Sequence, residues 1–277
     1  TPTAIEASFN GGPYVTIDAA PTGNTFSGTL NNQPIGQGTL TVRFTNDIGV
    51  LDDITDVGIG DIFVIAGQSN HSGRGNNNQV YTHGSLKATL FGNDDNWKEL
   101  VDPFDSNSGQ VDAVSSDNAA GSYIPLLATQ IMADQGVPVA FIPTAKGGSS
   151  IAQWQPGANH TDPTTLFGSM SRRINAVGGE VAAILFFQGE SDASASTPYV
   201  TYTAGLTTLV ETIVADFPGT PILIGQIGHS TFGFNDVIRE AQSDFPLTNA
   251  NAYLGAVTYD INLADESGDT LHFKSDN

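Results

Sequence analysis

The chain has 277 residues, of which 29 are acidic and nine are basic, so its formal net charge is −20. This charge disfavours nucleic acid as a partner, because binding a phosphate backbone needs clustered Lys and Arg side chains. The absence of cysteine excludes disulfides and cysteine-ligated metal sites, and no run of 18 apolar residues is present that would span a membrane.

Residues 1–57 have the pattern of a small β-rich module. Short alternating runs such as Tyr14–Ile17 and Thr39–Phe44 predict strands, and Gly, Pro and Asn between the runs predict turns. The chain starts at Thr1 and has no signal-like apolar segment. We therefore expect a processed protein or a fragment of a longer one, with additional domains beyond both termini.

Residues 58–277 alternate between continuous apolar runs and segments with the period of a helix. This alternation predicts an α/β domain in which helices cover both faces of a parallel sheet of about five strands. The predicted strands are Ile62–Ala66, Val137–Ile142, Val181–Phe187, Pro221–Ile227 and Tyr253–Val257. The predicted helices are Tyr123–Asp134, Leu166–Ala176, Tyr199–Asp216 and Asn235–Phe245. The polar stretch 75–121 is predicted to be an elaborated loop beside a site.

Polar side chains follow four of the predicted strands. They lie in Gly67–Asn70, Lys146–Ser150, Gln188–Asp192 and, after a longer connection, Asp269–His272. Ligands bind at the carboxyl ends of the strands in an open parallel sheet. We therefore expect these four segments to form one site.

A serine in this site needs other groups before it can act as a nucleophile. A base must take its proton, a further group must orient the base, and donors must stabilise the oxyanion. His272 follows Asp269 by three residues, so the two side chains can meet around one turn and leave a ring nitrogen for Ser69. The G-x-S-x-G elbow of α/β-hydrolases is absent, because His71 stands at the position of the second glycine.

The set of motifs resembles that of the SGNH hydrolases, most closely the sialate O-acetylesterase and carbohydrate esterase family 6 group. The resemblance covers about residues 58–276 and rests on Gly-Gln-Ser-Asn, Gly-Gly-Ser-Ser-Ile with Trp154, Gln-Gly-Glu-Ser-Asp and Asp-x-x-His. It implies a three-layer α/β/α fold with a flavodoxin-like sheet. It also implies a serine esterase that removes O-acetyl groups from an acetylated polysaccharide or a sialic-acid-like sugar without a cofactor.

The resemblance further implies roles for individual residues. Ser69 corresponds to the nucleophile and His272 to the general base. The backbone N–H groups of Ser69 and Gly148 correspond to oxyanion donors, and Gln188 stands where the family has a third donor, usually an Asn amide. Two candidates for the acid that orients His272 stay open. Asp269 is the usual partner and is preferred, whereas Glu190 has been taken as this acid in the family 6 branch.

Five residues near the motifs are candidates for substrate binding: Gln68, Asn70, Arg74, Lys146 and Trp154. The amides of Gln68 and Asn70 could instead brace the loop, and Arg74 and Lys146 could bind an anionic sugar or only support their loops. Trp154 could stack on a sugar ring or pack in the core. No set of His, Asp and Glu residues has the spacing of a metal site, so we expect no metal.

Two other functions compete with the esterase hypothesis. The chain could be a carbohydrate-binding or phage tail module with a degenerate esterase fold, or a lipase or thioesterase on the same fold. Loops rich in Gly, Asn and Ser favour a sugar over a long acyl chain. The same composition, with few Lys residues, favours an extracellular, secreted or virion-associated protein.

Overall fold

A computed structural model of the protein describes residues 3–75, 77–114, 120–228, 236–259, 261 and 271–273. The chain forms two compact units. The first contains Thr1–Asp61, His83–Lys87 and Ile131–Val139, and the second contains Ile62–Thr82, Ala88–Gln130 and Ala140–Asn277. The division into domains at residue 57 stays a prediction.

The first unit contains an antiparallel sheet with the strand order β2-β1-β3-β4. Its strands are β1 (Ile5–Phe9), β2 (Val15–Asp18), β3 (Gly36–Phe44) and β4 (Leu51–Ile59). Arg43 of β3 pairs with Glu6 of β1 at 2.9 Å and lies over the ring of Tyr14. The predicted β-rich module is thus confirmed.

The second unit contains a sheet with the strand order β11-β10-β9-β5-β8-β6-β7. Its strands are β5 (Asp61–Gly67), β6 (Thr89–Phe91), β7 (Trp97–Glu99), β8 (Val139–Pro143), β9 (Ala183–Phe187), β10 (Ile222–Gln226) and β11 (Ala252–Val257). β6 and β7 pair antiparallel, whereas β9 pairs parallel with both β5 and β10. The five predicted strands are β5 and β8 to β11. β6 and β7 lie in the stretch that was predicted to be a loop, because three-residue strands carry too little pattern to detect.

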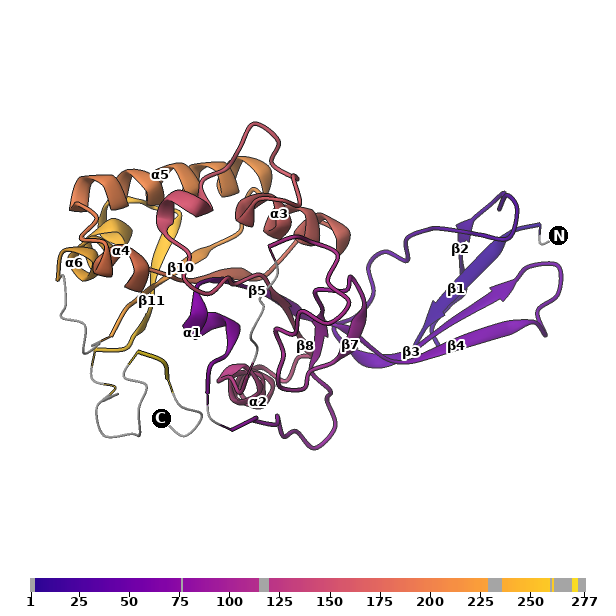
Figure 1. The fold of residues 1–277 in the computed structure, drawn as a ribbon. Coiled ribbons are helices and arrows are strands. Elements are labelled where there is room, and N and C mark those ends of the chain that lie inside the picture. The colour runs from indigo at the N-terminus through magenta and orange to yellow at the C-terminus, as the bar shows by residue number, and fades with distance from the viewer. Residues whose placement is uncertain are drawn as a thin grey trace. The chain divides into compact units, whose positions relative to one another are not determined.

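Helices cover both faces of this sheet, as the apolar runs predicted. Figure 1 shows α3, α5 and α6 on one face and α2 on the other. The helices are α1 (Ser69–Ser72), α2 (Ile124–Gln135), α3 (Leu166–Ala176), α4 (Glu190–Ser194), α5 (Tyr199–Asp216) and α6 (Asp236–Thr248), with a 3₁₀ turn η1 (Ile151–Trp154). The three-layer α/β fold is therefore confirmed. None of the described helices has the length and hydropathy needed to cross a membrane.

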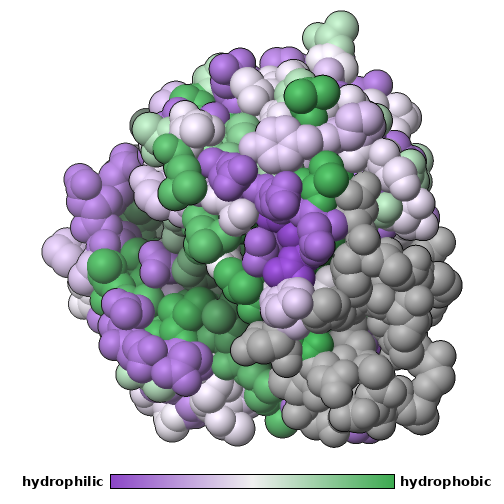
Figure 2. Space-filling view, turned by 90° about the vertical axis from the view of Figure 1, so that its left-hand side faces the viewer, coloured by the Kyte–Doolittle hydropathy of each residue, from purple (hydrophilic) through white to green (hydrophobic). Residues whose placement is uncertain are grey.

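The edge strand β11 is less well covered than the centre of the sheet. Leu254 and Val257 are each 49% exposed, whereas Val64 of β5 and Ile184 of β9 are completely buried. Figure 2 shows apolar surface around a hollow on this side of the molecule. The well-packed part of the sheet is thus its centre, which contains β5 and β9.

The ends of β5 and β9 are at the same level of the sheet. Gly67 of β5 is in register with Phe187 of β9, and the Gln68 N–H donates to the Phe187 carbonyl at 2.8 Å. A Cβ on Gly67 would lie 1.9 Å from that carbonyl oxygen, and its φ is +120°, so only glycine fits. The loops that follow the two strands consequently start side by side. The winding of the sheet also reverses around β5, which is where open α/β sheets bind ligands.

Candidate active site

Ser69 and His272 meet directly, although 203 residues separate them in the sequence. The Ser69 Oγ lies 2.9 Å from the His272 Nε2. Ser69 is the first residue of α1, directly beyond β5, and is 5% exposed. Both residues line a cavity of about 580 Å³ together with Gly147, Gly148 and Glu190. A hydroxyl and an imidazole at this distance can exchange a proton.

Two backbone N–H groups at the cavity are available to bind an oxyanion. Neither the Ser69 nor the Gly148 N–H has a protein acceptor among the described residues, and both residues line the cavity. Gly148 has a φ of +72° in a turn that the bond from the Ser149 N–H to the Lys146 carbonyl closes. Glycine adopts this conformation at little cost.

Gln188 does not provide the third donor that the family resemblance implied. Its amide Nε2 lies 2.7 Å from Asp192 Oδ2, 2.9 Å from the Ser149 carbonyl and 3.3 Å from Gln68 Oε1. An amide nitrogen carries only two hydrogens. Protein acceptors on the buried side of the loops occupy both, so neither is left to bind an oxyanion. Gln188 is fully buried and is not among the described residues that line the cavity. It therefore braces the site and is removed from the oxyanion hole.

Gln68 and Asp192 complete this brace, and the sequence analysis did not single out Asp192. The Gln68 Oε1 accepts the N–H groups of Gly189 and Ser191, both at 3.2 Å. Asp192 accepts from the Ile151 N–H at 2.7 Å and from the Thr197 hydroxyl at 2.9 Å. The Gln68 oxygen thus supports the loops, and Gln68 also lines the cavity. Asp192 belongs to the Gln-Gly-Glu-Ser-Asp motif, but its bond to Ile151 has no signal in the sequence.

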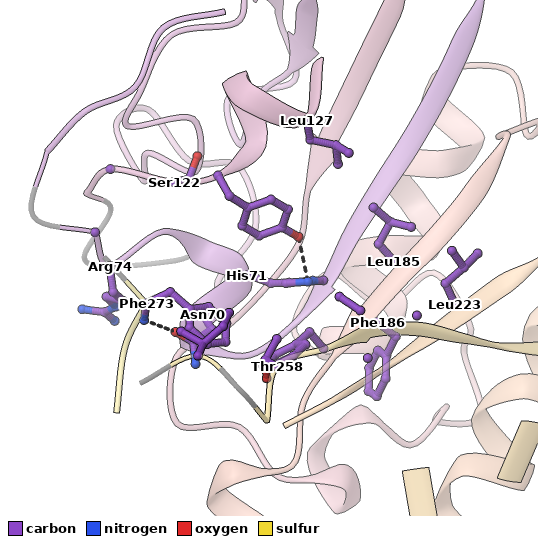
Figure 3. Close-up of a pocket in the computed structure, with 18 residues that line it drawn as sticks. Asn70, His71, Arg74, Ser122, Leu127, Leu185, Phe186, Leu223, Thr258 and Phe273 are labelled. Carbon is purple, nitrogen blue, oxygen red and sulfur yellow. Dashed lines mark hydrogen bonds between the residues drawn. The ribbon is translucent and has the colours of Figure 1, made fainter. Parts of the chain in front are cut away.

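Asn70 and Glu190 contact each other beside Ser69 and His272. The Asn70 Nδ2 donates to Glu190 Oε1 at 2.7 Å and to the Leu271 carbonyl at 3.3 Å. The Phe273 N–H donates to Asn70 Oδ1 at 3.0 Å, as Figure 3 shows. Burial raises the pKa of Glu190 to about 7, and the hydrogen bond from Asn70 lowers it in part. Asn70 is 6% exposed and its amide is occupied within the protein, which removes it from the substrate contacts.

His71 is a structural residue. Its Nδ1 lies 2.8 Å from the Ala66 carbonyl and its Nε2 lies 2.8 Å from the Tyr123 hydroxyl (Figure 3). Burial lowers its pKa to about 4, so the ring is neutral at pH 7. The ring stacks on Phe187 and borders a second, mainly apolar cavity of about 350 Å³, which Leu185 and Leu223 also line.

Trp154 does not bind substrate in this structure, which corrects the sequence-based expectation. Its side chain is 0% exposed, its indole N–H donates to the Ser149 hydroxyl at 3.0 Å, and it packs edge-on against Phe186. A completely buried ring cannot stack on a sugar. Lys146 is not among the described residues that line the cavity, and its N–H joins the loop to the Gly67 carbonyl at 3.0 Å.

Gln68 and Arg74 are the candidate substrate residues that line the cavity, and Arg74 is the charged one of the two. Its buried Nε has no hydrogen-bond partner among the described residues. Its Nη2 would lie 2.7 Å from a Cβ on Gly147, so a side chain at Gly147 would displace the guanidinium. Asp269 lies outside the described residues. Within the described part of the chain, no group of three or more His, Asp or Glu side chains could hold a metal ion.

Comparison with known proteins agrees with the sequence motifs. A protein family described as "carbohydrate esterase, sialic acid-specific acetylesterase" matches residues 59–277. A probable carbohydrate esterase from Arabidopsis thaliana is 29% identical over 206 residues, which are 68% of this chain and 76% of that protein.

Two solved structures share the fold. One, from Arabidopsis thaliana, has 24% identity and a TM-score of 0.61 and covers 78% of this chain and 92% of that one. The other, a carbohydrate acetylesterase from Xanthomonas citri, has 19% identity and a TM-score of 0.68 and covers 99% of this chain and 66% of that one. The family match spans most of the chain and includes all four predicted motifs. This chain therefore belongs to the sialic acid-specific acetylesterase family of carbohydrate esterases, and it is a hydrolase.

Proposed function

We propose that this carbohydrate esterase removes O-acetyl groups from a sugar by way of an acetyl-enzyme on Ser69. The observation that carries the proposal is the 2.9 Å contact between Ser69 Oγ and His272 Nε2 in a cavity with two unoccupied N–H groups. A serine hydroxyl alone is a poor nucleophile, and this arrangement supplies its base and its oxyanion donors.

The reaction has two halves. His272 Nε2 takes the Ser69 proton as Oγ attacks the acetyl carbonyl, and the N–H groups of Ser69 and Gly148 bind the oxyanion. The sugar oxygen then leaves with the proton held by His272. Water, deprotonated by His272, attacks the acetyl-enzyme, and acetate departs as Ser69 regains its proton. On the family resemblance we assign Asp269 as the acid that orients His272.

We further propose that the sugar carries a carboxylate close to the acetyl group, and that Arg74 binds it. Most other described Lys and Arg side chains donate to a carboxylate or amide oxygen of the protein: Arg43, Lys87, Lys98, Arg172, Arg173 and Arg239. Arg74 donates to none of the described residues, and it lies at the wall of the Ser69 cavity. A guanidinium without a protein partner fits a carboxylate on the ligand, which it can bind through two hydrogen bonds.

The cavity wall also favours a sugar over a long acyl chain. It contains the small residues Ser191, Ala193, Ser194 and Ala195 of α4 and the residue after it. A compact polar ligand suits these residues better than an extended apolar chain does. We keep an extracellular or virion-associated location as part of the proposal, on the strength of the composition alone.

A substrate panel tests both parts of the proposal. Acetate release is measured from O-acetylated glucuronic acid and from O-acetylated glucose, with Ser69→Ala and the matched control Ser243→Ala, which changes a serine on α6. We expect Ser69→Ala to abolish turnover and Ser243→Ala to retain it. Full activity in Ser69→Ala would contradict the mechanism.

The pair of sugars isolates the role of Arg74. Arg74→Gln should lower kcat/KM for the acidic sugar about 10- to 150-fold more than for the neutral one, because a charge-assisted hydrogen bond contributes about 1.5–3 kcal/mol. An equal loss on both sugars would instead place Arg74 at the oxyanion or in the fold, and the carboxylate proposal would be wrong.

A further inference from the structure

We propose that Asn70 is the residue that positions His272 opposite Ser69, and that Glu190 acts on His272 only through Asn70. This inference rests on the proposed function of Ser69 and His272. It gives Glu190 a role that differs from the one in the family resemblance, where Glu190 is a candidate for direct contact with the imidazole.

The amide of Asn70 holds both peptide groups that flank His272. Its Nδ2 donates to the Leu271 carbonyl, which precedes His272, and its Oδ1 accepts from the Phe273 N–H, which follows it. One hydrogen bond on each side of His272 fixes the position and direction of its backbone. The Cα that carries the His272 imidazole is consequently held in place.

Asn70 is also the residue directly after Ser69 on α1. The nucleophile and the anchor of the base therefore belong to one helical turn. Any movement of α1 relative to the sheet carries Ser69 and the backbone of His272 together. This coupling preserves the 2.9 Å distance between Ser69 Oγ and His272 Nε2, and such precision matters because small misplacements of reacting groups are costly.

Glu190 fixes which way the Asn70 amide faces. Its Oε1 accepts from Asn70 Nδ2 at 2.7 Å, the shorter of the two bonds that this nitrogen donates. If the amide were reversed, its oxygen would face the Glu190 carboxyl and its NH₂ group would face the Phe273 N–H. The contact with the Phe273 N–H would be repulsive in either state of Glu190, and the contact with the carboxyl would be repulsive when Glu190 is ionised. Glu190 thus selects the orientation that clamps His272.

The contacts of Glu190 favour this indirect role over direct support of the imidazole. Its described hydrogen bond to another side chain goes to Asn70, and its buried Oε2 has no hydrogen-bond partner among the described residues. Burial raises the pKa of Glu190 to about 7, so a large fraction of the carboxyl is neutral near that pH. A neutral carboxyl can still accept a hydrogen bond from Asn70 through its carbonyl oxygen, but it stabilises an imidazolium poorly.

Paired substitutions of Glu190 separate the two roles. Gln at this position retains an oxygen that can accept from Asn70 but carries no negative charge. We expect Glu190→Gln to keep kcat within about fivefold of the parent, and Glu190→Ala to lose about tenfold or more, the range typical of residues that orient catalytic groups. If Glu190→Gln is as damaging as Glu190→Ala, the charge itself is needed and the proposal is overturned.

A second variant tests Asn70 itself. Asn70→Ala should lower kcat about 10- to 100-fold and change KM for an acetylated sugar less than about threefold, because Asn70 holds the base and not the substrate. Asn159→Ala serves as the control, since Asn159 is exposed and its side chain bonds only to Thr161 of its own turn among the described residues. A rise in KM with kcat preserved would assign Asn70 to substrate binding and contradict the inference.

The outcome is distinguishable from failure of the proposed function. If Ser69→Ala keeps its activity, the mechanism fails as a whole. If Ser69 is essential but Asn70→Ala behaves like the parent, only the positioning role fails. Should Asn70→Ala not fold, as judged by circular dichroism, the comparison of Glu190→Gln with Glu190→Ala still decides the question.

Discussion

The two sheets of this chain differ in what their strand ends present. In the antiparallel sheet β1–β4, neighbouring strands run in opposite directions, so successive strand ends lie at opposite edges. In the second sheet β5 and β9 run parallel, and the loops after them bring Ser69 and Glu190 to one edge. In this second arrangement the loops after neighbouring strands converge at one edge of the sheet. The comparison predicts that substitutions at this edge affect catalysis, and that substitutions in the antiparallel sheet do not.

The largest effect is expected at His272. His272→Ala removes the base that we propose for Ser69, whose Oγ lies 2.9 Å from the His272 Nε2. We expect kcat for acetate release to fall about a thousandfold or more, as in other serine hydrolases that lose a triad member. Steady-state assays on an acetylated sugar measure this. A loss below tenfold would mean that another group activates Ser69.

The next effect concerns the brace beneath the site. Asp192→Ala leaves the Ile151 N–H and the Thr197 hydroxyl without their acceptor, and it removes the shortest of the three contacts of the Gln188 amide. Unsatisfied buried donors cost about 1–3 kcal/mol each, so we expect the free energy of unfolding to fall by at least about 2 kcal/mol and kcat to fall with it. Urea denaturation gives the first quantity. An unchanged midpoint would show that the brace is not needed.

A smaller effect is expected in the dependence of stability on pH. The pKa of Glu190 is raised by burial from 4.5 to about 7 in the folded protein, so between these values the folded chain holds a proton that the unfolded chain has lost. The stability contribution of this group is therefore full below pH 4.5 and is lost as pH rises through 7.

Glu190→Gln removes that titration. Between pH 4.5 and 7 the free energy of unfolding of the variant should decline less steeply than that of the parent, by about 1–3 kcal/mol over the window. Asp105, whose pKa burial also raises to about 7, keeps its own contribution in both proteins. Parallel pH profiles for the two proteins would be inconsistent with the raised pKa of Glu190.

The smallest effect is expected in the antiparallel sheet. Arg43→Gln breaks the ion pair with Glu6 and the contact with the Tyr14 ring. Partly exposed ion pairs of this kind contribute about 0–1 kcal/mol to stability. Arg43 is not among the described residues that line the Ser69 cavity. We expect unchanged kcat/KM and a small shift in Tm. A clear loss of activity would mean that the first sheet contributes to catalysis.

The sequence was sufficient for the parts of the molecule that follow local rules. The continuous apolar runs predicted β5 and β8 to β11, because strands buried on both faces have no polar positions. The contact between Ser69 and His272 followed from motifs placed after strand ends. Two strands, β6 and β7, escaped detection since each has only three residues, too few to show a pattern.

The errors in the site share one physical cause. Whether an amide or an indole faces a ligand depends on the acceptors that the fold places around it. Gln188 meets Asp192 and the Ser149 carbonyl, and Trp154 meets the Ser149 hydroxyl. None of these neighbours can be inferred from residue type or spacing alone. For the same reason, the role of Asn70 became visible only through its contacts with Leu271 and Phe273.

The central claim is that Ser69 forms a covalent acyl intermediate. Treatment of the protein with a serine-directed phosphonate, followed by peptide mass spectrometry, tests it most directly. We predict a single adduct on the peptide that contains Ser69, with loss of acetate release in proportion to labelling and no adduct at that peptide in Ser69→Ala. Complete inactivation with the label on another residue, or no loss of activity when Ser69 is fully labelled, would contradict the account.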